Sequence, residues 1–496
     1  MTSPKDNGLK RRDILRAISI AASAATLSPK FTAADSFGIA GSEPEQKPEI
    51  SGQTVRLAEY ATNLRYEEIP AEIVQRAKDC FADTVATILF GAPFPWSQMI
   101  IEQARLLGTG GNSAILSKNA NVSAPAAALA HGAMCHAFEQ DNITFPDSGA
   151  HPGAALVTSG LAVAQDRGSS GREVLTGIVA GAEVMIRVAL ATKRTNEARG
   201  FHAPGSVGPF GAAVVTGRLL HLDAGKMTSA LGIAGSTSGG LLEFAHSGDG
   251  AMVKRLHLGR AAEGGVLAGS LAAAGFTGPS TVLEGGAGFL HAFCNQTDLA
   301  ELTRELGETY QSRTITMKHY SCHITAHTSV EAMVDMRKQY GFSGSDIASI
   351  EIAGSKRMAT TNNIPVPNDI MLAQFSIPFC VALAAYRDPV DPYSFDDGAT
   401  KDPGILDVAS KVKISQAPGQ GDDDISTTIT VTLKDGRRLT KHVTEFLGTP
   451  GRPLTGSDLR EKFLLLTKNY SAKQMEEIYD RIQGVDRESN LNWLRV

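Results

Sequence analysis

Residues 136–157 read HAFEQDNITFPDSGAHPGAALV. The stretch joins two runs rich in Ala, Leu and Val, at 124–139 and 153–166, whose length and composition predict buried helices. Within sixteen positions it also places two histidines and several acidic or amide side chains: Glu139, Asp141, Asn142 and Asp147. Pro152 fits the first turn of the second helix and puts His151 beside its N-terminus, where exposed N–H groups favour anions and lower the affinity of an imidazole for a proton. An ordinary polar loop with a helix cap is the alternative interpretation of this stretch alone.

Helical spacing extends on both sides of this stretch, from about residue 54 to residue 300. Further helices are predicted at 172–193, 206–220, 223–234 and 259–275. Several carry Gly or Ala on more than one face, a composition typical of helices buried among other helices. Because small side chains let helices approach closely and the aromatic share is only 6%, we expect tight helix packing in place of an aromatic core.

The pattern changes near residue 314. The segments ASIEIAG (348–354), KVKIS (411–415) and STTITVTL (426–433) alternate or are β-branched, as strands are. Asp435-Gly436 follows the third segment and predicts a hairpin. Near residue 457 the helical pattern returns. The order helical, mixed α/β, helical therefore suggests a second domain inserted into the first.

The length of the chain fits two domains. A chain of 496 residues exceeds what one core usually sustains. The net charge of -5, with no basic run beyond the N-terminus, argues against a nucleic-acid partner. The five cysteines are scattered without a CxxC pair, so we expect buried free thiols and neither disulfides nor a zinc site.

The first forty residues have the layout of an export signal. Arg11 and Arg12 precede an uncharged stretch at 17–29 and then the small residues 32–34. Adjacent arginines followed by Ile-Leu resemble a twin-arginine signal, and the apolar stretch is too short to span a bilayer. We therefore expect a signal at 1–34, a linker at 35–51 and a periplasmic protein that leaves the membrane after processing. A disordered basic tail on a cytoplasmic protein is the alternative.

Three further segments concentrate titratable side chains ahead of predicted helices. GFHAPGSVGPFGAAVV (200–215) holds His202, and GAMVKRLHLGRAAEGG (250–265) holds Lys254, Arg255, His257 and Arg260. MKHYSCHITAHTSVEAM (317–333) lies where the pattern changes and holds Lys318, His319, His323 and His327. Together these segments supply acids, bases and cations, but no nucleophile with a base of its own.

Metal and nucleotide binding find weaker support. His319, His323 and His327 are spaced i, i+4, i+8 and would share one face of a continuous helix, but only the stretch after Thr325 has helical character. No GxGxxG follows a predicted strand and no GxxxxGK[ST] occurs, so the sequence does not indicate a nucleotide cofactor. We expect no metal site.

Five segments together resemble one family. HAFEQDN with HPGAALV, GFHAPGSVGPFGAA, VKRLHLGRAAEGG, KHYSCHITAH and AQFSIPF (373–379) follow the order of the MmgE/PrpD family. This family includes 2-methylcitrate dehydratase, cis-aconitate decarboxylase and iminodisuccinate epimerase. The resemblance extends from about residue 52 to the C-terminus.

The resemblance implies a mostly α fold, in which a large all-helical domain carries a smaller α/β lid domain inserted before the C-terminal helices. On this chain the helical domain would take residues 52–313 and 451–496, and the lid would take 314–450. Members of the family are usually homodimers, need no metal or organic cofactor, and act on small di- or tricarboxylates. The resemblance therefore implies a homodimer that binds a small carboxylate without a cofactor.

The resemblance also assigns site residues. By motif, the catalytic positions of the decarboxylase branch correspond to Glu139, His151, His202, Lys254 and His323. We expect six further residues to bind or brace the substrate: Gln140, Asp141, Asn142, Arg255, His257 and Lys318. The family's usual D-[FY]-[DN]-D-T differs here, because the first acid is the longer Glu139, Gln140 replaces the aromatic residue, and Ile143 replaces the threonine.

The chemistry shared by the family is proton removal from, or delivery to, a carbon beside a carboxylate. Cationic side chains would stabilise the enolate-like charge that develops, and neutral histidines suit the proton transfers. Our first hypothesis is a hydro-lyase (dehydratase) acting on a hydroxylated di- or tricarboxylate, with an epimerase or isomerase second and a decarboxylase third. A non-catalytic periplasmic carboxylate-binding protein is the alternative outside this class, and the helix-rich chain argues against it.

Overall fold

A computed structural model of the chain describes residues 52–118, 120–144, 148–247 and 251–496. The predicted export signal (1–34) and linker (35–51) lie outside the described residues. The described residues belong to one compact unit.

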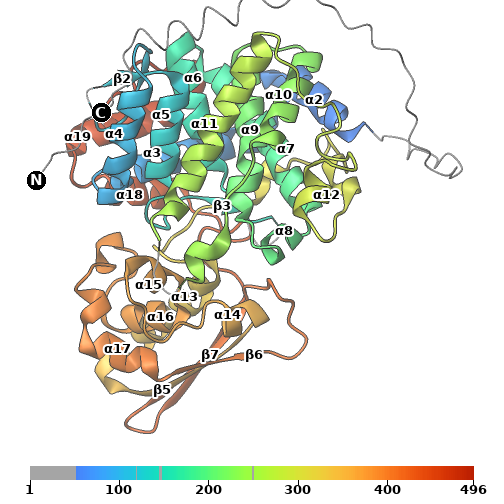
Figure 1. The fold of residues 1–496 in the computed structure, drawn as a ribbon. Coiled ribbons are helices and arrows are strands. Elements are labelled where there is room, and N and C mark those ends of the chain that lie inside the picture. Colours follow the sequence, from blue (N-terminus) through green and yellow to red (C-terminus); the bar gives the residue numbers. More distant parts are fainter. Residues whose placement is uncertain (1–51, 119, 145–147, 248–250) are drawn as a thin grey trace, which may run out of the picture. The chain divides into compact units, whose positions relative to one another are not determined.

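Helices make up most of the described residues, which confirms the predicted mostly α fold (Figure 1). Up to residue 302 the α-helices are α2 (Gln53–Asn63), α3 (Ala71–Gly91), α4 (Pro95–Leu107), α5 (Ala124–Cys135), α6 (Thr158–Arg167), α7 (Gly171–Ala191), α8 (Thr195–Ala198), α9 (Ala203–Leu219), α10 (Ala224–Ser236), α11 (Val253–Ala273) and α12 (Phe289–Phe293). A π-helical turn, η2 (Gly153–Val157), leads directly into α6. One short ladder pairs β1 (Ser113–Ala114) with β2 (Asn121–Val122).

After residue 314 the chain forms both strands and shorter helices. The helices are α13 (His327–Tyr340), α14 (Lys356–Thr360), α15 (Ile370–Phe375), α16 (Ile377–Tyr386) and α17 (Pro403–Ser410). A four-stranded sheet has the order β6-β5-β7-β8, formed by β5 (Ile347–Gly354), β6 (Val412–Gln416), β7 (Thr427–Leu433) and β8 (Arg438–Val443). β5 runs parallel to β6 and antiparallel to β7, which in turn pairs antiparallel with β8. The three predicted strands and the hairpin at Asp435-Gly436 are thereby confirmed, and Gly436 adopts the left-handed φ of 91° that such a turn requires.

The chain then returns to the first group of helices. α18 (Gly456–Leu466) and α19 (Ala472–Gln483) both pack against α3. Lys462 of α18 donates to Asp83 of α3 at 2.5 Å and to the carbonyl oxygen of Gln140 at 3.0 Å. The C-terminal helices therefore brace the loop that follows α5. The domain borders at 314 and 450 stay predictions.

The core is centred on α5, α9 and α11, which lie side by side, with α7 against α9 (Figure 1). Backbones touch where glycines face each other. A Cβ on Gly132 of α5 would lie 2.6 Å from the carbonyl oxygen of Leu258, and a Cβ on Gly259 of α11 would lie 2.5 Å from that of Leu129. The tight helix packing expected from the small residues is therefore confirmed.

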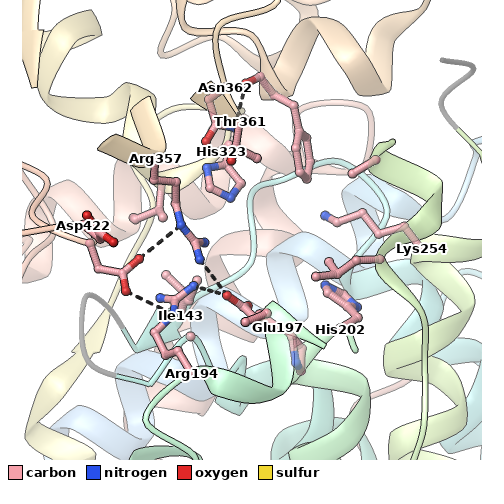
Figure 2. Close-up of a pocket in the computed structure, with 18 of the residues that line it drawn as sticks. Ile143, Arg194, Glu197, His202, Lys254, His323, Arg357, Thr361, Asn362 and Asp422 are labelled. Atoms are coloured by element: carbon pink, nitrogen blue, oxygen red, sulfur yellow. Dashed lines mark hydrogen bonds and ion pairs between the residues drawn. The ribbon is translucent and has the colours of Figure 1, made fainter. Parts of the chain in front are cut away.

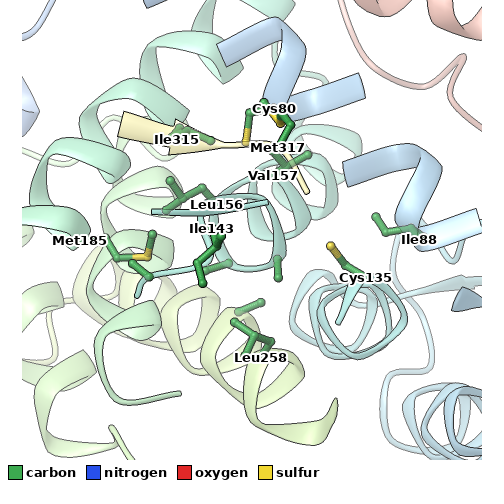
Figure 3. Packing of buried hydrophobic residues seen from close by; sticks show 14 of the residues in the cluster. Cys80, Ile88, Cys135, Ile143, Leu156, Val157, Met185, Leu258, Ile315 and Met317 are labelled. Atoms are coloured by element: carbon green, nitrogen blue, oxygen red, sulfur yellow. The ribbon is translucent and has the colours of Figure 1, made fainter. Parts of the chain in front are cut away.

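Sulfur-containing and aliphatic side chains fill the remaining space of this core, as Figure 3 shows for Cys80, Cys135, Met185 and Leu156. All five cysteines are buried and free, as the sequence predicted. α7 is long and apolar enough to cross a bilayer, but almost all of it is buried in the protein, and a buried core helix passes the same test.

Two helix ends differ from the prediction. α5 ends at Cys135 and not at residue 139, and Glu139 itself adopts a left-handed φ of 58° that is not helical. α11 begins at Val253 and not at 259. Lys254 and His257 therefore lie on the helix and not ahead of it. The apolar spacing missed the first turn of α11 because the buried side chains of that turn are the polar Lys254 and Arg255.

Candidate active site

One cavity of about 470 Å³ brings together segments that are far apart in the sequence (Figure 2). Its wall includes the loop after α5, the turn at α8, the starts of α9 and α11, the segment before α13, α14, and the loop between β6 and β7. The basic side chains are Lys193, Arg194, Lys254, Lys318, Lys356 and Arg357, and the acidic ones are Glu139, Glu197, Asp422 and Asp423. Six positive groups against four negative ones leave two positive charges, so the cavity suits an anion.

The five residues predicted as catalytic all line this cavity: Glu139, His151, His202, Lys254 and His323. Lys318, predicted to bind substrate, lines it as well. The other five predicted residues, Gln140, Asp141, Asn142, Arg255 and His257, do not. We therefore take this cavity as the candidate active site.

Local structure explains how these side chains reach the cavity. His202 is the residue that precedes α9, and Lys254 lies in the first turn of α11. A short antiparallel ladder pairs β3 (Ile143–Thr144) with β4 (Ile315–Thr316). This ladder brings the loop after α5 beside the segment that carries Lys318.

Glu139 lies between two ammonium groups. One of its oxygens pairs with Lys254 Nζ, and the other accepts a hydrogen bond from Lys318 Nζ at 2.8 Å. The three side chains are each at most 5% exposed. Burial lowers the pKa of both lysines, and for Lys254 the charges of Lys318 and Arg255 add to this effect. The paired carboxylate of Glu139 favours the charged form of both lysines against this effect. Two ammonium groups against one carboxylate then leave a positive charge that can attract a ligand carboxylate.

Asp141 joins two imidazoles below the cavity wall. Its Oδ2 accepts from Nδ1 of His136 at 2.9 Å and from Nδ1 of His151 at 2.7 Å. Burial acts to raise the pKa of Asp141, but the two histidines hold it well below its ordinary 3.8, so the carboxylate is ionised. Because Nδ1 of His151 carries the donated hydrogen, the nitrogen left for the cavity is Nε2, which in the neutral ring can accept a proton.

His202 and His257 form a second imidazole pair, whose Nδ1 atoms share a hydrogen bond at 3.0 Å. Burial, followed by the neighbouring histidines 257 and 151, lowers the pKa of His202 to about 3. Burial and the charge of Lys254 lower the pKa of His257 to about 4. Both rings are therefore neutral near pH 7, and His257 supports His202 from outside the cavity.

His323 has the opposite tautomer from His151. Its Nδ1 accepts from the backbone N–H of Thr325 at 3.4 Å and lies 2.9 Å from the Thr325 hydroxyl. A neutral ring whose Nδ1 accepts must carry its hydrogen on Nε2. Burial and then the charges of Arg357, Lys318, Lys254 and Arg194 keep the pKa of His323 well below 6.5. His323 therefore presents a neutral N–H donor.

Among the described residues, one group has atoms close enough to hold a metal ion: His136, Asp141 and His151, within 4.8 Å of one another. The same atoms form the hydrogen bonds given above, and we interpret the group as a hydrogen-bonded set. The histidines at 319, 323 and 327 do not share a helix face, since α13 begins only at His327.

Three residues predicted to contact substrate are engaged elsewhere, so the structure does not support that role for them. Gln140 donates to Ser321 Oγ at 2.6 Å and faces a second, smaller pocket. Asn142 donates to Asp83 at 2.9 Å and accepts from the backbone N–H of residue 153 at 2.8 Å. The Arg255 guanidinium stacks 4.5 Å over the ring of Trp96. Their polar groups are used to hold the loop and α11 in place.

The sequence did not predict a set of charged residues that line the cavity. Arg194 and Glu197 lie at α8, Arg357 lies on α14, and Asp423 lies in the loop between β6 and β7. The only local signal was a Lys-Arg pair in each of two polar segments, KR at 193–194 and at 356–357. Such pairs are usual on solvated surfaces, so the sequence alone did not select them.

Two family models match the chain, the MmgE/PrpD N-terminal domain over residues 55–302 and the MmgE/PrpD C-terminal domain over residues 320–484. The chain belongs to the MmgE/PrpD family. The resemblance drawn from the five sequence segments is thus confirmed.

Curated relatives in this family span most of the chain. A protein named cis-aconitate decarboxylase from Aspergillus terreus is 26% identical over 470 residues, which is 89% of this chain and 95% of the relative. The protein of the same name from Mus musculus is 25% identical over 418 residues, covering 81% of this chain and 83% of the relative. A "cis-aconitate decarboxylase-like protein oryM" from Aspergillus oryzae is 30% identical over 302 residues, covering 58% of this chain and 62% of the relative.

Proposed function

We propose that the protein is a lyase that removes water from a small hydroxylated di- or tricarboxylate by histidine-mediated proton transfer beside a carboxylate. Family membership, together with relatives named cis-aconitate decarboxylase, supports the coarser conclusion that the chain is an enzyme acting on a carboxylate. One observation carries the finer proposal: a proton acceptor, His151, and a hydrogen-bond donor, His323, line the same cavity with two lysines.

In this mechanism the substrate carboxylate binds beside Lys254 and Lys318. His151 Nε2 takes the proton from the carbon next to that carboxylate, and the two ammonium groups stabilise the enolate-like charge. The electrons of the broken C–H bond form the alkene as the hydroxyl leaves. The neutral His323 donates a hydrogen bond from Nε2–H to that hydroxyl, and the imidazolium formed at His151 delivers the proton that makes the leaving group water. Glu139 fixes both lysines through its two oxygens. His202 hydrogen-bonds the substrate and is the alternative proton acceptor.

Decarboxylation is the second candidate, and the names of the relatives favour it. Loss of carbon dioxide leaves the bonding electrons on the neighbouring carbon, where the lysines would stabilise them and a histidine would deliver a proton. This reaction needs a proton donor but no acceptor. The acceptor on His151 is the feature that places dehydration first.

A substrate panel separates the candidates. The purified chain is incubated in deuterated water with cis-aconitate and with saturated hydroxylated di- and tricarboxylates, while ultraviolet absorption, carbon dioxide release and label uptake are measured. A dehydratase forms or consumes an alkene without releasing carbon dioxide, and a decarboxylase releases it from the unsaturated acid. An epimerase takes up label at the α-carbon without alkene formation. Tight binding of these acids without any turnover would refute both lyase proposals.

His202→Ala tests the site independently of the reaction. Acid–base groups of this kind contribute about 100- to 10,000-fold each, so turnover should fall within that range while the far-ultraviolet circular dichroism spectrum stays unchanged. Near-normal turnover would remove His202 from the site. The homodimer expected from the family also stays a prediction, which light scattering of the purified chain can test.

A further inference from the structure

Four charged side chains form a set of ion pairs on one side of the cavity. Glu197 Oε2 lies 2.5 Å from Arg194 Nη2 and 2.8 Å from Arg357 Nη2. Asp423 lies on the other side of the same two guanidinium groups, 3.1 Å from Arg357 Nε and 3.7 Å from Arg194 Nε. Two arginines therefore hold two carboxylates. In Figure 2 Arg194 and Arg357 lie apart from Lys254, which occupies the opposite side of the cavity.

The two carboxylates of this set are held very differently. Glu197 belongs to α8 and its side chain is only 13% exposed. Burial acts to raise its pKa, but the charges of Arg194 and Arg357 lower the value to about 2, so Glu197 is always ionised at neutral pH. Asp423 lies in the stretch GQGDDDIS (419–426) between two strands, and its side chain is 33% exposed. Of the two anions, Asp423 is the one that a loop movement can withdraw.

The backbone under the arginines is also unusual. Lys193 and Arg194 both adopt left-handed φ values, 48° and 56°, although neither is glycine. Such conformations cost free energy and persist only where the surrounding structure imposes them, and they are common at ligand sites. Here they direct the Arg194 side chain toward Glu197 and Asp423 at the cavity.

We propose that Arg194 and Arg357 form a subsite for a second carboxylate of the substrate, which the carboxylate of Asp423 occupies until the substrate displaces it. This inference rests on the proposed function, and it assigns the residues that bind the second carboxylate of that di- or tricarboxylate. One carboxylate binds at Lys254 and Lys318, and the other binds at the two arginines. A ligand carboxylate that replaces Asp423 leaves the number of ion pairs unchanged and satisfies both guanidinium groups.

The charge of the cavity supports a doubly charged ligand. The basic side chains that line it exceed the acidic ones by two, and withdrawal of Asp423 and its neighbour Asp422 would increase this excess. Figure 2 shows His323 between Arg357 and Lys254, and all three residues line the cavity. A diacid bound at both ends would therefore extend past His323.

Binding of unreactive acids tests this subsite without any need for turnover. Isothermal titration calorimetry would compare glutarate, a five-carbon diacid, with pentanoate, the five-carbon monoacid. The full chain should bind glutarate more tightly. Arg357→Met should weaken glutarate binding about tenfold or more, the value of one charge-assisted contact, and should change pentanoate binding less than about threefold. Arg438→Met is the matched control, because it removes an arginine that also pairs with a carboxylate, Glu351, but does not line the cavity, and it should have a small effect on both acids.

Asp423→Asn should tighten glutarate binding severalfold, because the competing carboxylate is lost, and this gain should vanish in the Arg357→Met background. A purely structural ion cluster predicts instead that both variants lower the melting temperature and change the two affinities alike, which would overturn the subsite. Equal binding of glutarate and pentanoate by the unmodified chain would overturn the subsite alone. Binding of neither acid would overturn the proposed function together with it.

Discussion

The strongest test of the proposed mechanism compares two histidines that share a hydrogen-bond partner. His136 and His151 are both buried, and both donate Nδ1–H to the same oxygen of Asp141, at 2.9 and 2.7 Å. Only His151 lines the cavity. Glutamine can replace the lost N–H donor but cannot accept a proton at neutral pH. His151→Gln and His136→Gln therefore make the same change on the two sides of one carboxylate.

The expected effects follow from these contacts. In each variant Asp141 keeps one imidazole partner, so the free energy of unfolding should fall by a similar amount, about 1.5–3 kcal/mol at most for a hydrogen bond to a charged group. Turnover should fall about 100- to 10,000-fold in His151→Gln, equivalent to about 3–5 kcal/mol of activation free energy, and by no more than about tenfold in His136→Gln.

Steady-state turnover of a substrate found in the panel measures the loss of activity. Urea unfolding of the same preparations measures the loss of unfolding free energy. Exchange of the substrate α-hydrogen with solvent deuterium shows whether the lost step is proton removal. Equal losses of turnover in the two variants would refute the reasoning, because Asp141 would then matter only for packing. A His151→Gln variant that still exchanges the α-hydrogen at the normal rate would also refute it.

Three further predictions concern stability and location. Gly265→Ala should lower the free energy of unfolding by about 1–3 kcal/mol, because the new Cβ would lie 2.3 Å from the Cβ of Ala212. Gly264→Ala should raise it by up to about 1 kcal/mol, because the nearest atom to its new Cβ is 3.8 Å away. Urea titrations compare the two variants. Burial lowers the pKa of His131 to about 4 from its ordinary 6.5, so between these values the unfolded chain binds a proton that the folded chain does not. The contribution of neutral His131 to the free energy of unfolding is therefore complete above pH 6.5 and falls by about 3 kcal/mol as the pH drops to 4. Between pH 7 and pH 4.5, urea titrations should show a smaller loss of unfolding free energy for His131→Gln than for the unmodified chain. We also propose export through a twin-arginine signal, so cell fractionation and intact mass should find a periplasmic protein without residues 1–34; a cytoplasmic protein of full mass would contradict this.

Much of the fold could be predicted because its signals are local. Small residues on several faces of 206–220 and 259–275 indicated buried helices, and α9 and α11 form the core at these places. Alternation at 426–433 and the Asp-Gly pair behind it indicated a hairpin that the structure contains. Helix ends were predicted less well, because the end of α5 and the start of α11 depend on polar residues whose partners lie elsewhere in the chain.

The site could be predicted only in part. Titratable residues crowded next to apolar helices, together with the resemblance to the family, indicated the segments of Glu139, His202, Lys254 and His323, and all four line the cavity. The sequence could not tell Glu139 from its neighbour Gln140, one of which faces the cavity while the other donates to Ser321 outside it. Adjacent positions in a loop carry no periodicity that would distinguish an inward side chain from an outward one.

The amino-acid sequence by itself determined the helices, the strands and the segments that carry the chemistry, because each of these depends on the composition of a short window. Only the tertiary structure decided the opposite tautomers of His151 and His323 and the ion pairs of Arg194 and Arg357. A tautomer is set by the partner of the other ring nitrogen, and an ion pair by two charges that fold together from positions such as 197 and 357. Such pairings join residues that are distant in the chain, so no local pattern records them.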